Sequence, residues 1–364
     1  MAAGPRGPSC RPLSFPGTAT IVATWRKQAQ PGGMKNVEIE YDVVVVGGGA
    51  AGLSAALVLG RARRRVAVVD AGAPRNAPAA HMQGFLSRDG MPPRDLLAIG
   101  RAEVAVYGVH LISGSVVGIE PGFRVDLADG SSLATRRVLV ATGLRDDIPD
   151  IPGVAERWGR DVLHCPYCHG YEVRDQPLGV LGGTPDAVQH ALLVRQWSPD
   201  VTFFPHTYTL PPEEREQLAA RGIKIATGTV RRLVVEEDQL RGVELDTGSV
   251  SRAAVFVRPR LVPSSGLLTT LGCAVDDHGW VVVDAAGRTS VPGIWAAGNA
   301  VDPRAQVITA AGAASAAAIS INADLVDEEI RDAVAERRRR NELFSPAAER
   351  QVTEIVLGDR RHGL

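Results

Sequence analysis

The sequence predicts an α/β protein with two strand–turn–helix units, and three observations carry this prediction. An apolar run at 41–46 (YDVVVV) leads into a glycine-rich turn and then a segment rich in Ala and Leu. A second apolar run, at 178–181, is also followed by a glycine-containing turn and an apolar segment. Between the two units lie Cys165 and Cys168, separated by two residues. This pattern is typical of parallel sheets whose loops bind nucleotides.

Length and composition narrow the class of protein. The chain has 364 residues, with 45% hydrophobic and 22% charged residues, as in ordinary globular proteins of two domains. A formal net charge of −1 gives no reason to expect nucleic acid as a partner. We expect no membrane span, because the most apolar stretch, 305–321, is Ala-rich and reads as a tightly packed helix. Four cysteines are too few for a disulfide-stapled secreted protein, so we expect a reducing, cytoplasmic location.

The order of these patterns predicts a first Rossmann-like three-layer domain that is interrupted by a second one. A Pro-rich stretch at 148–153 is typical of a hinge between them. The expected segments are a disordered extension (1–40, preferred to a transit peptide), the first domain in two parts (41–148 and 262–326), the inserted domain (149–261) and a charged tail that frays (327–364).

The first glycine-rich turn has the spacing of a dinucleotide-binding motif. Gly47 permits a tight turn, Gly49 lets the backbone approach a pyrophosphate, and Gly52 lets the helix pack closely on the strand. The start of the helix supplies amide donors for the phosphates. Asp70 ends the next strand, where a carboxylate can bind a ribose hydroxyl. The alternative is a glycine-rich turn with no ligand.

The cysteine pair is expected to cycle between a dithiol and a disulfide. A helix start lowers the pKa of a thiol, and His164 and His169 could stabilise a thiolate or carry its proton. Residues 165–169 also fit the C-x-x-C-H pattern of haem attachment, but the sequence signals neither a secreted chain nor a haem fold. A zinc site would need a second ligand pair, which is not apparent, so we expect no metal. An idle thiol pair is the remaining alternative.

A second nucleotide-type segment follows at 289–299 (TSVPGIWAAGN). Gly298 allows a close approach, Asn299 could bind a ribityl hydroxyl, and the helix after Gln306 would point its N-terminus at a flavin ring. The alternative is an ordinary buried strand and turn. Of the other cysteines, Cys10 lies in the expected extension, and Cys273 is expected to be a buried small hydrophobic residue.

Together these residues resemble the bacterial-type low-molecular-weight thioredoxin reductases, which are FAD-dependent pyridine nucleotide–disulfide oxidoreductases. The resemblance spans about 41–325 and rests on YDVVVVGGGAAGLSAAL, LVATG (139–143), CPYC, TSVPGIWAAGN and QVITAAG (306–312). The stretch CPYCHGYE (165–172) also resembles the branch that contains the gliotoxin- and holomycin-type dithiol oxidases. Those enzymes close a disulfide in a small molecule and pass electrons through FAD to oxygen.

The resemblance implies a cofactor, a redox disulfide and a homodimer. Cys168 would contact the flavin, Cys165 would exchange with the substrate, and His169 stands where the family has an aspartate as proton donor. Asn299 likewise replaces the usual aspartate. The implied FAD-binding residues are Gly47, Gly49, Gly52, Asp70, Gly298, Asn299 and Gln306.

The inserted domain departs from the pattern of NADPH-using members. Thr184 stands in place of the second glycine of the turn, where a Cβ crowds the pyrophosphate. His206 and Thr207 stand where a pair of arginines would bind the 2′-phosphate. We expect a flavoprotein that exchanges electrons with a thioredoxin-like protein or a small-molecule dithiol, with NADPH in doubt. A dithiol oxidase that uses oxygen, and a redox sensor without turnover, are the alternatives.

Overall fold

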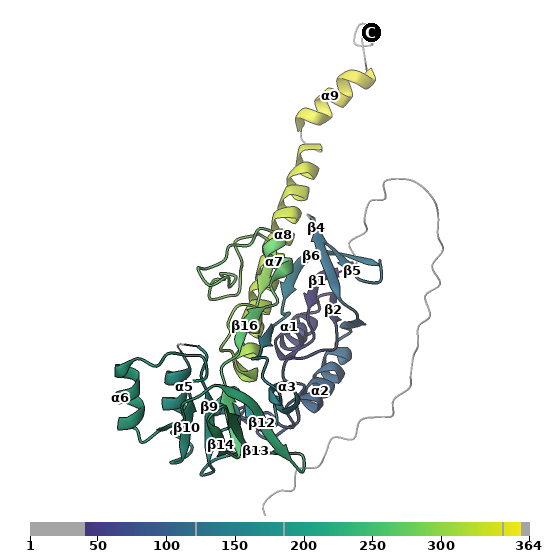
Figure 1. Cartoon of the computed structure of the whole chain (residues 1–364). Helices are drawn as coiled ribbons and strands as arrows, with labels where there is room; N and C mark the ends of the chain where they lie inside the picture. Colours follow the sequence, from purple (N-terminus) through teal and green to yellow (C-terminus); the bar gives the residue numbers. More distant parts are fainter. Residues whose placement is uncertain (1–40, 121, 185, 344–345, 358–364) are drawn as a thin grey trace, which may run out of the picture. The chain divides into compact units, whose positions relative to one another are not determined.

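The computed structural model describes residues 41–120, 122–184, 186–343 and 346–357, all within one compact unit, 38–364 (Figure 1). The expected extension at 1–40 lies outside the described residues. Two sheets with parallel strands and packed helices, of seven and five strands, form the frame of the fold, and the α/β class with two Rossmann-like units is confirmed.

The first sheet contains the predicted strand that precedes the glycine-rich turn. Its parallel part has the order β3-β2-β1-β6, with β17 beside β6, and β5 and β4 extend it as an antiparallel edge. The strands are β1 (Tyr41–Val46), β2 (Val66–Asp70), β3 (His110–Ser113), β4 (Val116–Glu120), β5 (Arg124–Leu127), β6 (Ser132–Val140) and β17 (Ile294–Ala296). Val43, Val44 and Val45 are fully buried because both faces of β1 are covered.

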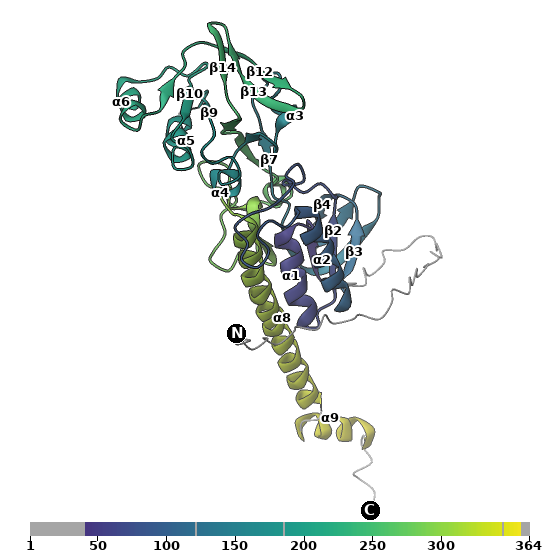
Figure 2. The ribbon, with the colours of Figure 1, turned by 90° about the horizontal axis from the view of Figure 1, so that it is seen from below.

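Helices α1 (Ala50–Arg61), α2 (Pro93–Val106) and α8 (Val307–Leu343) belong to this unit. Helices α1 and α8 run side by side (Figure 2), and small residues let them approach closely. Ala55, Ala56, Ala314 and Ala317 are among the fully buried residues of their shared core. The stretch 305–321 is therefore a packed helix from Val307 onward, as its composition predicts.

The segment after residue 327, expected to be a charged tail that frays, is largely helical in the structure, and its fraying stays a prediction. Helix α8 continues to Leu343, and α9 (Pro346–Leu357) follows. Arg136 on β6 donates to Glu328 at 3.0 Å and to Glu329 at 2.9 Å, while Arg137 donates to Asp324 at 2.6 Å. These ion pairs attach residues 324–329 of α8 to β6. By length and composition alone, α8 could also cross a membrane, a test that core helices of soluble proteins pass as well.

The second sheet belongs to the inserted segment. Its parallel strands have the order β11-β10-β9-β15-β8, and a three-stranded antiparallel sheet, β12-β13-β14, accompanies it. The strands are β8 (Val162–Leu163), β9 (Leu178–Leu181), β10 (Val201–Phe204), β11 (Lys224–Ile225), β12 (Val230–Glu236), β13 (Gln239–Leu245), β14 (Gly248–Ser251) and β15 (Ala254–Val257). The helices are α3 (Val154–Arg157), α4 (Pro166–His169), α5 (Ala187–Val194) and α6 (Pro212–Ala220).

Two short strands connect the two sheets. The chain leaves the first unit through β7 (Leu144–Asp147) and returns through β16 (Arg260–Pro263), and the two pair antiparallel. Helix α7 (Gly266–Thr270) and the 3-10 turn η1 (Gly298–Ala300) then lead to α8. The β7–β16 ribbon therefore connects the inserted segment to the first unit. The domain limits 41–148, 149–261 and 262–326 remain predictions.

Candidate active site

The three glycines of the first turn have three different surroundings. Gly47 has φ +106°, and a Cβ there would lie 2.4 Å from the Ala141 carbonyl oxygen. A Cβ on Gly52 would lie 1.8 Å from the Gly47 carbonyl oxygen, so this glycine is needed for the helix to pack on the strand. A Cβ on Gly49 would meet nothing within 4 Å. Open space at Gly49, at the start of α1, is what a pyrophosphate needs.

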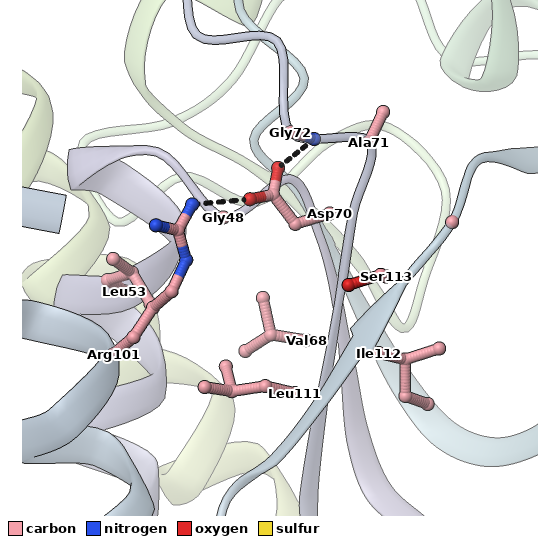
Figure 3. Close-up of a pocket in the computed structure, with 11 residues that line it drawn as sticks. Gly48, Leu53, Val68, Asp70, Ala71, Gly72, Arg101, Leu111, Ile112 and Ser113 are labelled. Atoms are coloured by element: carbon pink, nitrogen blue, oxygen red, sulfur yellow. Dashed lines mark hydrogen bonds and ion pairs between the residues drawn. The ribbon is translucent and has the colours of Figure 1, made fainter. Parts of the chain in front are cut away.

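Asp70 lines a pocket at the carboxyl ends of β2 and β3, with a volume of about 250 Å³ (Figure 3). Its carboxylate receives a hydrogen bond from Arg101 at 3.0 Å and one from the Gly72 backbone at 3.3 Å. Ser113, the partner of Asp70 in the register of β2 and β3, also lines the pocket. The pocket offers a carboxylate for ribose hydroxyls and apolar walls, including Leu111 and Val68, for a base. The role of Arg101 could not be predicted from the sequence, because no motif connects it with Asp70, 31 positions earlier in the chain.

Cys165 and Cys168 form a disulfide at the start of the short helix α4, with their Cα atoms 5.2 Å apart. Cys165 is the N-cap, and its carbonyl accepts the backbone N–H groups of Cys168 and His169, both at 3.1 Å. Both cysteines are half-buried, whereas Tyr167 between them is 65% exposed. The ring of Tyr167 meets Trp197 edge-to-face at 5.5 Å. The predicted redox pair is thus present, with one aromatic side chain facing solvent beside it.

The disulfide lies next to the predicted flavin-side residue Gln306. The Gln306 Nε2 atom is 4.0 Å from the Cys168 Sγ atom, at the N-terminus of α8. The residues expected to hold the isoalloxazine end and the redox pair therefore meet, and Cys168 is the member that faces this end.

Two histidines flank the cysteines in half-buried positions. Burial lowers the pKa of His169, and the nearby Glu172 carboxylate acts in the opposite direction. Burial also lowers the pKa of His164, against a backbone hydrogen bond with Val257. A neutral imidazole can accept the proton of a thiol, so His169 has the protonation state that a base needs.

Gly298 and Asn299 shape the turn before α8. Gly298 has φ +71°, and a Cβ there would lie 3.0 Å from the Ala51 side chain. The glycine therefore allows this turn to lie close to α1. The Asn299 amide donates to the carbonyls of Asp302 and Ala305 at 2.8 and 3.0 Å, and its oxygen lies 3.4 Å from Arg75. Asn299 therefore holds the loop before Gln306, and its binding of a ribityl hydroxyl remains a prediction.

The second glycine-containing turn carries its own charges. Asp186 stands at the N-terminus of α5, where a dinucleotide phosphate would bind, and its carboxylate pairs with Arg258 at 3.1 Å. His206 has φ +57°, and its Nδ1 accepts the Val230 backbone N–H at 3.1 Å. Thr184 and Thr207 are exposed beside this turn. The N-terminus of α5 therefore carries the carboxylate of Asp186. His206, which stands where an arginine would bind the 2′-phosphate, is hydrogen-bonded to the backbone of β12.

The residues of the first unit fit a flavin dinucleotide. The turn at Gly49 is open for the pyrophosphate, Asp70 and its pocket suit the adenosine end, and Gln306 with the start of α8 suits the ring end. A parallel sheet with this turn, joined to a disulfide at the ring end, defines a flavin-linked disulfide oxidoreductase.

Comparisons with known proteins agree with this class. Residues 41–317 match the family described as pyridine nucleotide-disulphide oxidoreductase. Thioredoxin reductase sirT of Leptosphaeria maculans is 32% identical over 305 residues, which are 78% of this chain and 93% of the relative. The chain belongs to the pyridine nucleotide-disulphide oxidoreductases and is an enzyme similar to thioredoxin reductases. Family membership implies FAD as the cofactor.

Solved structures show the same likeness. The crystal structure of HlmI is 59% identical, with a TM-score of 0.82, and the match covers 85% of this chain and 99% of that one. The putative thioredoxin reductase TrxB from Bacillus anthracis is 35% identical with a TM-score of 0.76, over 79% of this chain and 99% of that one. The fold and the redox disulfide predicted from the sequence are therefore confirmed.

Proposed function

We propose that this enzyme oxidises a small-molecule dithiol at the Cys165–Cys168 disulfide and uses dioxygen, not a nicotinamide, as its second substrate. A substrate thiolate attacks Cys165, and the Cys165–Cys168 bond breaks to leave a mixed disulfide and the Cys168 thiolate. The second substrate thiol then displaces Cys165, so that the substrate leaves as a disulfide and both cysteines are reduced. FAD, which the Gly49 turn and the Asp70 pocket would hold, would supply the two-electron chemistry that links the reduced cysteine pair to dioxygen, and the two substrate protons would leave with the reduced oxygen as hydrogen peroxide.

The surroundings of Cys165 and Cys168 support these two roles. Cys168 lies beside Gln306 and the N-terminus of α8, whose positive dipole end favours a thiolate there. His169 directly follows Cys168, and burial lowers its pKa and so favours the neutral imidazole, the form that can accept a proton. Cys165 is left as the sulfur for exchange with the substrate. CPYCHGYE, which contains all three residues, resembles the dithiol oxidases of small molecules.

The single observation that carries the proposal is the Asp186–Arg258 pair at the start of α5. A carboxylate at this helix N-terminus repels the pyrophosphate that a nicotinamide dinucleotide would place there. Arg258 and Arg260, which follow β15, could otherwise contact a phosphate, but Arg258 is paired with Asp186 and Arg260 with Asp147. Two missing arginine–phosphate contacts, at about 1.5–3 kcal/mol each, would weaken NADPH binding by orders of magnitude.

A second candidate is an NADPH-dependent thioredoxin reductase. It is favoured by the names of several relatives, among them thioredoxin reductase of Listeria monocytogenes, 29% identical over 302 residues. In that case the exposed ring of Tyr167 would meet a protein substrate. For either candidate we propose a cytoplasmic homodimer, on the family resemblance.

The two candidates are separated by anaerobic stopped-flow reduction of the purified flavoprotein. We expect dithiothreitol or ethane-1,2-dithiol to bleach the flavin faster than NADPH or NADH does, and admitted oxygen to be consumed in turnover. The double variant Thr184→Gly/Asp186→Ala should gain reduction by NADPH, because it opens the turn and removes the negative charge. Rapid stoichiometric reduction of the unmodified protein by micromolar NADPH, with transfer to thioredoxin, would establish the second candidate.

A further inference from the structure

Arg75 lies in the long connection between β2 and α2, residues 71–92, which contains no regular helix or strand. Its guanidinium makes a two-bond fork to Asp146 on β7, at 2.7 and 2.8 Å. The Asp146 side chain is only 9% exposed, so its charge depends on this partner. Connections of this length in compact domains are uncommon and are often functional.

The same guanidinium reaches the turn that leads to the redox centre. Arg75 Nη1 lies 3.4 Å from the Asn299 side-chain oxygen, and the Asn299 amide holds the Ala305 carbonyl at 3.0 Å. The next residue is Gln306, whose amide lies 4.0 Å from the Cys168 sulfur. Three polar contacts and the peptide bond from Ala305 to Gln306 thus connect Asp146, through Arg75 and Asn299, with the residue that contacts Cys168.

We propose that Arg75 is a positioning residue that fixes Cys168 at the N-terminus of α8 by holding the β7 connection and the Asn299 turn together. Its fork holds Asp146 on the strand through which the chain enters the inserted segment. Its remaining contact holds Asn299, which sets the loop before Gln306. The proposal rests on the redox role of Cys165 and Cys168 and is independent of which electron donor the enzyme uses.

The residue types fit this role. A planar guanidinium can bind a carboxylate with two parallel bonds and still direct a third N–H elsewhere, whereas a lysine ammonium cannot reproduce the fork. Asn299 suits the turn better than an aspartate, because its amide donates to two carbonyl oxygens that a carboxylate would repel.

The test uses the Cys165→Ser protein, in which Cys168 is left as a free thiol. Its readouts are the long-wavelength thiolate-to-flavin absorbance per bound FAD and the rate at which iodoacetamide alkylates Cys168. In the Arg75→Met/Asp146→Asn double variant, which leaves no unpaired buried charge, we expect most of the absorbance band to be lost. Alkylation of Cys168 should become about tenfold faster, which corresponds to a loss of about 1.4 kcal/mol in the free energy that holds Cys168 in its protected position. Arg75→Lys, which keeps the charge, should give an intermediate band.

The matched control is Arg260→Met/Asp147→Asn on the same two connecting strands. This ion pair joins Asp147, the residue after Asp146 on β7, to Arg260 on β16. It is exposed, and among the described residues it makes no contact with Asn299. We expect it to keep the band, the FAD content and the alkylation rate. Unchanged band and alkylation in both Arg75 variants would overturn the proposal. Equal loss of the band in the control would also overturn it, since the effect would then come from loosening the ribbon alone.

Discussion

Gln306 Nε2 lies 4.0 Å from Cys168 Sγ, and these two residues come from opposite sides of the β7–β16 connection. Cys168 belongs to the short helix α4 of the inserted segment, and Gln306 directly precedes α8 of the first unit. The contact between the two residues places the disulfide at the N-terminus of the long helix α8. The favourable field of that helix end gives Cys168 the surroundings of a reactive thiolate.

Gly49→Val should give a folded protein without FAD. A Cβ at Gly49 meets no protein atom within 4 Å, so the valine can be accommodated, but it fills the space that the pyrophosphate needs. The measurement is the flavin absorbance of the purified protein, together with its circular dichroism. Gly266→Val, at a glycine that is equally open, is the control and should stay yellow. Gly52→Ala should instead fail to fold, because its Cβ would lie 1.8 Å from the Gly47 carbonyl oxygen. A yellow Gly49→Val protein would contradict the assigned site.

Glu328→Gln should destabilise the protein at neutral pH by about 1–2 kcal/mol, because Arg136 and Arg137 lose a charged acceptor. Burial acts to raise the pKa of Glu328, but hydrogen bonds from these arginines outweigh it and the pKa is lowered. The lowered pKa means that this stabilisation is present above the ordinary value of 4.5 and is lost as the pH falls below it. Urea unfolding of the variant and the unmodified protein at neutral and acid pH measures the difference, which should shrink in acid.

Glu336→Gln is the control for this prediction. Its partners Arg339 and Arg340 are exposed, so unfolding should hardly change. An equally large effect there, or an effect of Glu328→Gln that grows as the pH falls, would contradict the account of how α8 is held.

His190→Leu should reduce the loss of stability in mild acid. His190 is 3% exposed, its Nδ1 atom has no hydrogen-bond partner, and its pKa is lowered to about 3 by burial and, secondarily, by the nearby His164. Since the unfolded chain takes up a proton near pH 6.5 and the folded chain does not, stability is lost as the pH falls from 6.5 toward 3. This amounts to about 2 kcal/mol at about pH 5. Urea midpoints at about pH 7 and about pH 5 should lie closer together in the variant.

His278→Leu, at an exposed loop position, serves as the comparison and should keep the full acid sensitivity. Equal acid sensitivity in the His190 variant and the unmodified protein would show that His190 takes up its proton without unfolding.

Features set by local sequence could be predicted. The strands at 41–46, 66–70, 178–181 and 201–204 are short apolar runs that are buried on both faces, so their composition identifies them. The glycine turn follows from steric demands that act within a few residues. Cys273, expected to be a small buried residue, is 6% exposed and belongs to a hydrophobic core.

Features set by distant partners could not be predicted. The ion pair that attaches α8 to β6 at Glu328 comes from Arg136, which lies 192 positions earlier in the chain. The fork from Arg75 to Asp146 spans 71 positions, and neither residue belongs to a motif. Asn299 has the right place in the motif, but its amide binds two backbone carbonyls that only the folded turn brings to it. Such contacts carry no signal in a single sequence, because any charged residue could have supplied them.

The most direct test of the central claim, that the Cys165–Cys168 disulfide exchanges electrons with FAD through Cys168, is the visible spectrum of two single variants. The position of Cys168 beside Gln306 predicts that Cys165→Ser leaves a thiolate next to the flavin, with a long-wavelength charge-transfer band that disappears on acidification. Cys168→Ser should lack that band, because Cys165 is the sulfur left for exchange with the substrate. A band in Cys168→Ser alone would reverse the two roles, and its absence from both flavin-loaded variants would contradict the claim.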